Sequence, residues 1–117
     1  MPSDKNSESS PIRLLLELDR TVHEPARLAI LVILSVVEKA DFLYLLNETE
    51  LSRGNLSSHT SKLQEAGYIT IEKAFVDRIP RTAYQITPEG KSAFDAYRQS
   101  ITEAIQTDHP SQSQVNV

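Results

Sequence analysis

Residues 51–69 read LSRGNLSSHTSKLQEAGYI, and this stretch predicts a capped helix with two unlike faces. Ser52 is a favourable N-cap residue, and Gly67 stands where the end of a helix favours a left-handed residue. The residues expected to face the core recur at intervals of three and four, as one side of a helix requires. They are Leu56, Thr60, Leu63 and Ala66.

The opposite side of this helix, which is predicted over residues 52–66, is suited to hydrogen bonding with DNA. Arginine can pair bidentately with guanine in the major groove, and asparagine can pair with adenine. The predicted DNA contacts of the helix are Arg53, Asn55, Ser57, Ser58, His59, Ser61 and Lys62. The plainer interpretation is a solvated face on an ordinary amphipathic helix, and this stretch alone leaves both open.

A shorter helix is predicted just before it, over residues 42 to about 48, with Asp41 as its cap. Its expected inner face is Phe42, Leu43 and Leu46. Two short helices joined by a tight turn, the second with a polar outer face, form a helix-turn-helix. Gly54 falls in the first turn of the second helix. There it either permits close approach of a phosphate or is merely tolerated.

Two alternating stretches follow and predict a β-hairpin. Residues 68–74 (YITIEKA) and 81–87 (RTAYQIT) alternate as half-buried strands do, with a tip of about six residues between them. Pro80 cannot donate to a strand ladder, so it belongs at the loop or the strand edge. The cations that flank the tip are Lys73, Arg78 and Arg81. A basic hairpin directly after a helix-turn-helix is a wing that can lie on the phosphate backbone or in the minor groove. The alternative is a solvated hairpin.

Proline at the first position marks three further helices. The first is predicted over residues 11 to about 21. The second begins at Pro25 and is apolar nearly all round, which predicts a buried central strut. The third is predicted over residues 88–106. His23, at the entry to the second helix, is interpreted as a structural histidine rather than a metal ligand. Residues 1–9 and 107–117 are polar and are predicted to be disordered tails.

The predicted fold class is therefore α+β and mainly α. It is a winged helix-turn-helix over residues 10–106, with a two-stranded β wing and a C-terminal dimerisation helix. An apolar seam on that last helix would be exposed in the wing domain alone, which predicts a homodimer. The predicted dimer interface is Leu15, Leu18, Phe94, Tyr97, Ile101 and Ile105. In the alternative, the seam folds back onto the first two helices and the protein is a monomer.

The charge distribution fits contact with DNA at one end of the molecule. The net charge of the 117-residue chain is −4, yet residues 51–87 are net basic. In that segment the cations are Arg53, Lys62, Lys73, Arg78 and Arg81, and the anions are Glu65, Glu72 and Asp77. An acidic body with a basic tip is a reasonable layout because only the tip meets phosphate.

The absence of cysteine excludes disulfides, zinc–thiolate sites and a thiol nucleophile. The opening residues, MPSDKNSESS, contain no apolar core of a signal peptide. The longest apolar run is too short to span a bilayer. We therefore expect a cytoplasmic protein with no membrane partner.

Three stretches together resemble the winged helix-turn-helix transcriptional regulators of bacteria and archaea, in the MarR/ArsR/PadR-like group. They are HEPARLAIL at 23–31, LSRGNLSSHTSKLQEAGYI at 51–69 and RTAYQITPEGKSAF at 81–94. The likeness is greatest to the small stand-alone domains of that group. It implies sequence-specific binding of double-stranded DNA, a homodimer, and room for a small-molecule effector between helices or at a dimer interface.

Two departures from the group matter. Thr60 stands where such proteins usually carry an aliphatic residue, so the recognition helix is expected to pack less tightly. The cysteine and histidine clusters of metal-sensing relatives are missing, so no metal and no other cofactor are expected.

Two other classes of function compete with DNA-binding regulation. One is a winged-helix module for protein–protein contact without specific DNA binding. The other is an enzyme, which the sequence disfavours because it has no G-x-G or G-K-[ST] phosphate loop. Ser58 and His59 are adjacent, but neither an orienting group nor an oxyanion site accompanies them, so no catalytic residue is assigned.

Overall fold

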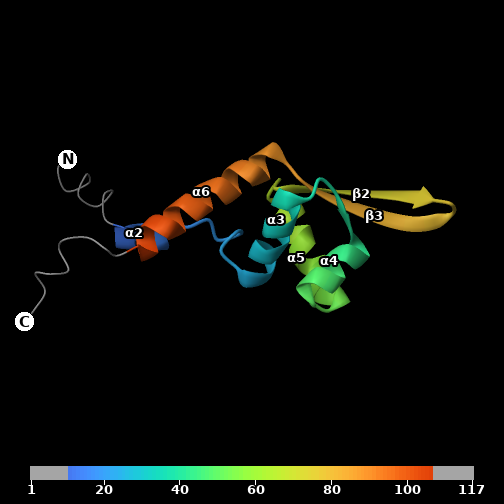
Figure 1. Ribbon diagram of the computed structural model, residues 1–117, viewed down its shortest axis with the longest axis horizontal. Helices are drawn as coiled ribbons and strands as arrows, with labels where there is room; N and C mark the ends of the chain where they lie inside the picture. The colour runs from blue at the N-terminus through green and yellow to red at the C-terminus, as the bar shows by residue number, and fades with distance from the viewer. Residues whose placement is uncertain (1–10, 107–117) are drawn as a thin grey trace, which may run out of the picture. The chain divides into compact units, whose positions relative to one another are not determined.

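The structure is a computed structural model that describes residues 11–106 (Figure 1). The tails predicted at 1–9 and 107–117 lie outside the described residues. In chain order the elements are α2 (Pro11–Leu16), α3 (Pro25–Val36), β1 (Ala40–Asp41), α4 (Phe42–Thr49), α5 (Arg53–Glu65), β2 (Ile69–Val76), β3 (Ile79–Ile86) and α6 (Pro88–Ile105). The predicted mainly helical α+β class and the winged arrangement are confirmed.

The chain forms two compact units. The central unit is Asp19–Phe94, and the terminal unit contains the described residues up to Leu18 and from Asp95 onward. Helix α6 begins in the central unit and ends in the terminal unit. A single domain over residues 10–106, with its last helix serving dimerisation, stays a prediction.

The predicted caps of the helix-turn-helix are present. The Asp41 carboxylate accepts a hydrogen bond from the Tyr44 amide at 2.8 Å, and the Ser52 hydroxyl accepts one from the Asn55 amide at 3.1 Å. Gly67 has a φ of 82°, the left-handed conformation expected after the end of α5. These local signals fix where α4 and α5 begin and where α5 ends.

The core of the central unit consists of apolar side chains from its helices and its sheet. The fully buried ones include Val22, Ile30, Leu31, Leu34, Leu45, Leu56, Leu63 and Ile69. Helix α3 packs on α4, α5 and β3. The prediction of a strut buried on most sides was therefore wrong, since Val32 and Val36 are exposed. In α4 the buried residue is Leu45, whereas Leu43 is half exposed.

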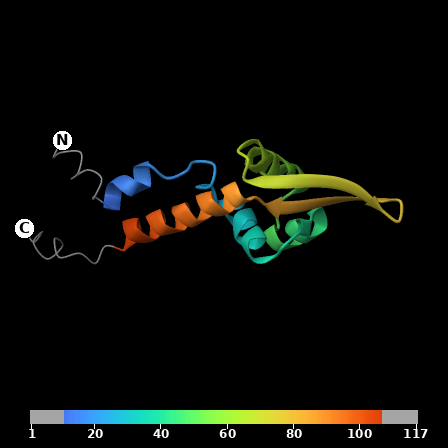
Figure 2. The same cartoon turned by 90° about the horizontal axis from the view of Figure 1, so that it is seen from above.

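The sheet has three antiparallel strands in the order β1-β3-β2. Strands β2 and β3 are the predicted two-stranded wing, and β1 is a third strand that was not predicted. Strand β1 is only two residues long, and it pairs Ala40 with Tyr84. The predicted six-residue tip is corrected to a two-residue turn. Asp77 and Arg78, with φ of 53° and 68°, connect the last pair of the ladder. In Figures 1 and 2 the outer part of the β2–β3 hairpin extends past α4, with the turn at its free end.

Helix α2 ends at Leu16, five residues before its predicted end. The physical reason is Asp19, whose carboxylate accepts hydrogen bonds from the backbone amides of Thr21 (2.8 Å) and Val22 (3.2 Å). Such a side-chain bond offers the backbone a turn in place of the helix.

Helix α6 begins as predicted, with the Thr87 hydroxyl accepting a hydrogen bond from the Gly90 amide at 2.9 Å. A Cβ on Gly90 would lie 2.0 Å from the carbonyl oxygen of Tyr68, so α6 crosses the start of β2 too closely for any side chain there. Among the helices of residues 11–106, none combines the length with the apolar character that a membrane-spanning helix needs.

Candidate nucleic-acid interface

Helix α5 presents an exposed polar face whose orientation is fixed by the core. Leu56, Thr60 and Leu63 are buried on its inner side, as predicted. The predicted DNA contacts that lie exposed on its outer side are Asn55, Ser57, Ser58, Ser61 and Lys62. Gly54 belongs to the same exposed surface, and an added Cβ there would meet nothing within 4 Å. Packing therefore does not require glycine at this position.

Thr60 stands where the resembling family usually carries an aliphatic residue, and its hydroxyl is hydrogen-bonded in the core. Its hydroxyl donates to the carbonyl oxygens of Leu56 (2.9 Å) and Ser57 (3.1 Å), and it is bonded to the Tyr84 hydroxyl. Burial raises the pKa of Tyr84, and the bond with Thr60 offsets part of that rise. The buried hydroxyl of Thr60 is therefore hydrogen-bonded, as a buried polar group requires.

Arg53 begins α5 and stacks on an aromatic ring. Its guanidinium carbon lies 5.6 Å from the centroid of the Phe42 ring, within the range of a cation–π contact. Nearby, Arg81 of β3 lies 3.8 Å from the Asp41 carboxylate. Both arginines line an open groove of about 350 Å³ between the start of α4 and the wing. Two of the predicted DNA-contacting cations are thus brought to the same surface.

The wing carries exposed cations and exposed apolar side chains together. Lys73, Arg78 and Arg81 are exposed on the strands and the turn, as the sequence indicates. The turn holds Arg78 in a left-handed conformation that non-glycine residues seldom adopt. The apolar residues beside the turn were not singled out from the sequence, and they are Phe75, Val76 and Ile79.

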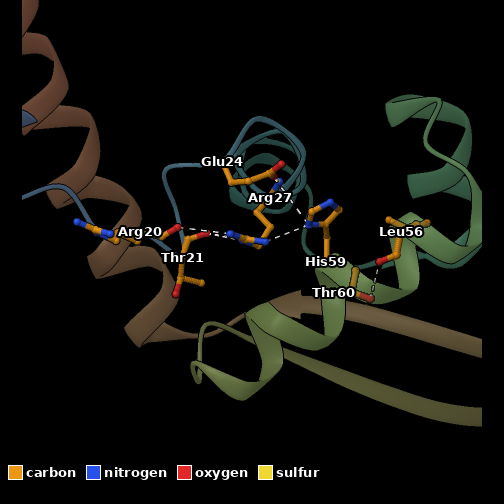
Figure 3. Close-up of polar contacts among 7 residues, drawn as sticks. All are labelled: Arg20, Thr21, Glu24, Arg27, Leu56, His59 and Thr60. Atoms are coloured by element: carbon orange, nitrogen blue, oxygen red, sulfur yellow. Dashed lines mark hydrogen bonds and ion pairs between the residues drawn. The ribbon is translucent and has the colours of Figure 1, made fainter.

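His59 is turned toward the start of α3 (Figure 3). Its Nδ1 lies 3.1 Å from a terminal nitrogen of Arg27 and 3.8 Å from the Glu24 carboxylate, and its side chain is 20% exposed. Partial burial raises the pKa of Glu24, but the Arg27 amide and the nearby His59 lower it by more, so the net pKa lies below its usual value. A role of His59 in DNA contact stays a prediction.

Of the residues predicted for the dimer interface, some are buried within the chain and others are exposed. Phe94 and Tyr97 are buried within the single chain, as is Leu18. Ile105 is 65% exposed, while Ala104, which was not predicted, is buried in its place. The buried side of α6 therefore passes through Ala104, one residue before the predicted seam ends. Ile101 is half buried and Leu15 is 40% exposed.

Residues 26–105 match the family model described as winged helix DNA-binding domain. The chain belongs to this family. The fold is therefore that of a winged helix DNA-binding domain, and the predicted relation to winged helix-turn-helix transcriptional regulators is confirmed.

The chain is also similar to individual proteins and solved structures. An uncharacterized protein of Methanocaldococcus jannaschii is 35% identical over 71 residues, which cover 61% of this chain and 77% of that protein. The structure of a transcriptional regulator homologue from Pyrococcus horikoshii OT3 has a TM-score of 0.70 and 28% identity, covering 90% of this chain and 95% of its own. A MarR-family transcriptional regulator from Silicibacter pomeroyi shares the fold, with a TM-score of 0.57 and 22% identity over 86% of this chain and 70% of its own.

Proposed function

We propose that this winged-helix protein is a sequence-specific regulator of transcription that binds double-stranded DNA. In this proposal α5 enters the major groove, and the β2–β3 wing lies on the adjacent backbone or in the minor groove. The observation that carries it is the exposed face of α5. Its amide, hydroxyl and ammonium groups have no role in the core, and a glycine that packing does not require lies among them.

Arg53 and Asn55 are the proposed base readers. Both are exposed in the first turn of α5, and their side chains can form the bidentate pairs that distinguish guanine and adenine from other bases. The stacking of Arg53 on Phe42 holds its guanidinium in a defined place before DNA arrives, which reduces the entropy lost on binding.

A homodimer is part of the proposal. Helix α2 buries none of its six residues, and its exposed apolar side chains Ile12, Leu15 and Leu16 share one face. Ile105 of the same terminal unit is also exposed. Since Phe94 and Tyr97 are already buried, we propose that these exposed residues carry the dimer contact. A two-fold dimer would place two copies of α5 on half-sites about one helical turn apart.

The test is a selection of bound sequences from a random duplex pool, followed by substitution of both base readers. Arg53→Ala with Asn55→Ala should cost about 1–3 kcal/mol for each lost base contact on the selected site. The matched control is Lys91→Ala with Gln99→Ala, which removes one cation and one amide from the exposed surface of α6. A double variant in α5 that still prefers the selected site over random DNA as strongly as the wild type would overturn the assignment.

The exposed apolar residues of the wing favour a second candidate, a module for protein–protein contact without specific DNA binding. Phe75 is 74% exposed, and Val76 and Ile79 are about half exposed. The salt dependence of binding to random duplex DNA separates the two functions. A DNA-binding protein loses affinity linearly on a log–log plot against salt, and a protein-binding module has no such affinity to lose.

A further inference from the structure

Arg27, in the first turn of α3, connects the loop between α2 and α3 (residues 17–24) to the recognition helix α5 (Figure 3). Its Nε donates to the carbonyl oxygen of Thr21 at 2.6 Å, and one terminal nitrogen donates to that of Arg20 at 3.4 Å. The other terminal nitrogen lies 3.1 Å from His59 Nδ1. A guanidinium can only donate, so Nδ1 accepts and the ring proton of a neutral His59 is on Nε2.

The loop is held from a second direction as well. Asp19 accepts from the amides of Thr21 and Val22 through one carboxylate oxygen, and its other oxygen accepts a hydrogen bond from the Tyr68 hydroxyl. Tyr68 immediately precedes β2. The loop backbone is therefore fixed to both α5 and the start of the sheet, and this fixes where the Cα of Arg20 lies.

Between this loop and the end of α5 lies an open groove of about 480 Å³, which we call the loop groove. It is lined by Arg20, Thr21, Arg27, Lys62, Glu65 and Ala66. Arg20 and Lys62 are exposed, and within residues 11–106 the side chain of neither forms a hydrogen bond or an ion pair. Glu65 is the one carboxylate in the lining, so cations outnumber it. The loop groove lies at the end of α5 opposite to Arg53, where the groove beside the wing lies.

We propose that the loop groove binds a phosphate group of the DNA backbone, with Arg20 and Lys62 as its ligands and Arg27 as a positioning residue. This inference rests on the proposed function. If α5 lies in the major groove, a phosphate backbone runs along each side of that groove, about 12 Å apart. The wing would meet one backbone, and the loop groove would meet the other. Two contacts on opposite sides would fix the register of α5 without reading bases.

The experiment is the salt dependence of binding to a random-sequence duplex, measured with the intact chain. Removing one phosphate contact should lower the slope of log K against log salt by about 0.9. Arg20→Gln should therefore lower the slope by about that amount. Lys91→Gln, which removes the same charge beside the far end of α3, should leave it unchanged. An unchanged slope in Arg20→Gln would overturn the loop groove as a phosphate site while leaving DNA binding itself intact.

Failure of the proposed function has a different signature, because the wild-type chain itself would then show no salt-dependent binding. The role of Arg27 is separated by a double-mutant cycle. If Arg27 acts by holding the loop that carries Arg20, Arg27→Met should lower the slope, and adding Arg20→Gln should lower it little further. Additive losses would show that Arg27 contacts phosphate independently and would overturn its positioning role. Thermal unfolding of each variant confirms that the fold is retained. Arg20→Gln alters only an exposed side chain and keeps the phosphate proposal testable even if Arg27→Met unfolds.

Discussion

Gly54 and Gly90 both lie in helices, but their surroundings are opposite. A Cβ on Gly90 would meet the Tyr68 carbonyl oxygen at 2.0 Å, and one on Gly54 would meet nothing within 4 Å. We expect Gly90→Ala to lower the free energy of unfolding by about 2–3 kcal/mol, as overpacking does. Gly54→Ala should raise it by about 0.5–1 kcal/mol, since alanine favours a helix.

Urea unfolding of the two variants and the wild type measures both changes. If a phosphate approaches α5 at Gly54, Gly54→Ala should also weaken DNA binding although the protein is more stable. A Gly90→Ala protein as stable as the wild type would contradict the close crossing of α6 over the start of β2.

The Tyr68 hydroxyl gives stability a dependence on alkaline pH. Its hydrogen bond to Asp19, together with burial, raises the pKa of Tyr68 to about 12. A pKa raised in the folded state means that the contribution is full below the unfolded value of about 10 and is lost as pH rises through about 12. The free energy of unfolding should therefore fall more steeply between these pH values in the wild type than in Tyr68→Phe. Parallel slopes in the two proteins would show that this bond does not stabilise the fold.

Among the elements, the wing is the part whose cations we expect to add affinity without reading sequence. Arg78 has a φ of 68°, so Arg78→Gly removes the guanidinium while keeping a residue that suits the turn. It should weaken binding to selected and random duplexes alike and lower the log–log salt slope by about 0.9. Lys91→Gln serves as the charge-matched control. A changed base preference with an unchanged slope would mean that the wing reads sequence or DNA shape instead.

Element boundaries were predictable where a cap marked them. Asp41 and Ser52 mark the starts of α4 and α5 through hydrogen bonds to nearby amides, and Gly67 marks the end of α5 through its positive φ. Each of these signals depends on local sequence alone. The two-residue turn of the wing was missed because Asp77 is followed by Arg78 and not by the glycine that usually completes such a turn. Strand β1 was missed because two residues show no periodicity, and it exists only through its pairing with β3.

For the whole molecule, we expect a homodimer that depends on the exposed apolar face of α2. Leu16 is 73% exposed, and a glutamate there would place a charge without a partner in an apolar contact. Sedimentation at micromolar concentration should give a dimer mass for the wild type and a monomer mass for Leu16→Glu. Thr70→Glu, which adds the same charge on exposed β2 in the other unit, should remain a dimer. A monomeric wild-type chain would reject this part of the proposal.

The candidate DNA surface was predictable from the sequence only in part. The outer face of α5 follows from helical periodicity, so its exposed residues could be named in advance. The loop groove could not be predicted, because Arg20 and Arg27 come to the same groove as Lys62 only through tertiary packing. No motif or spacing in the sequence links these residues. The exposed part of the predicted dimer surface could not be named in advance for a similar reason. Periodicity identifies the apolar side of α6, but whether Phe94 and Tyr97 are covered within one chain depends on the fold.

Methylation interference on a duplex selected by the wild-type protein tests most directly whether α5 reads the major groove. Methylation of guanine N7 blocks an acceptor in the major groove, and methylation of adenine N3 blocks one in the minor groove. We expect guanine N7 methylation at positions within each half-site to abolish binding, and we expect Arg53→Ala to remove the sensitivity at one such guanine. A protein that enriches no sequence, or that binds its selected duplex equally well with every guanine N7 methylated, would contradict the central claim.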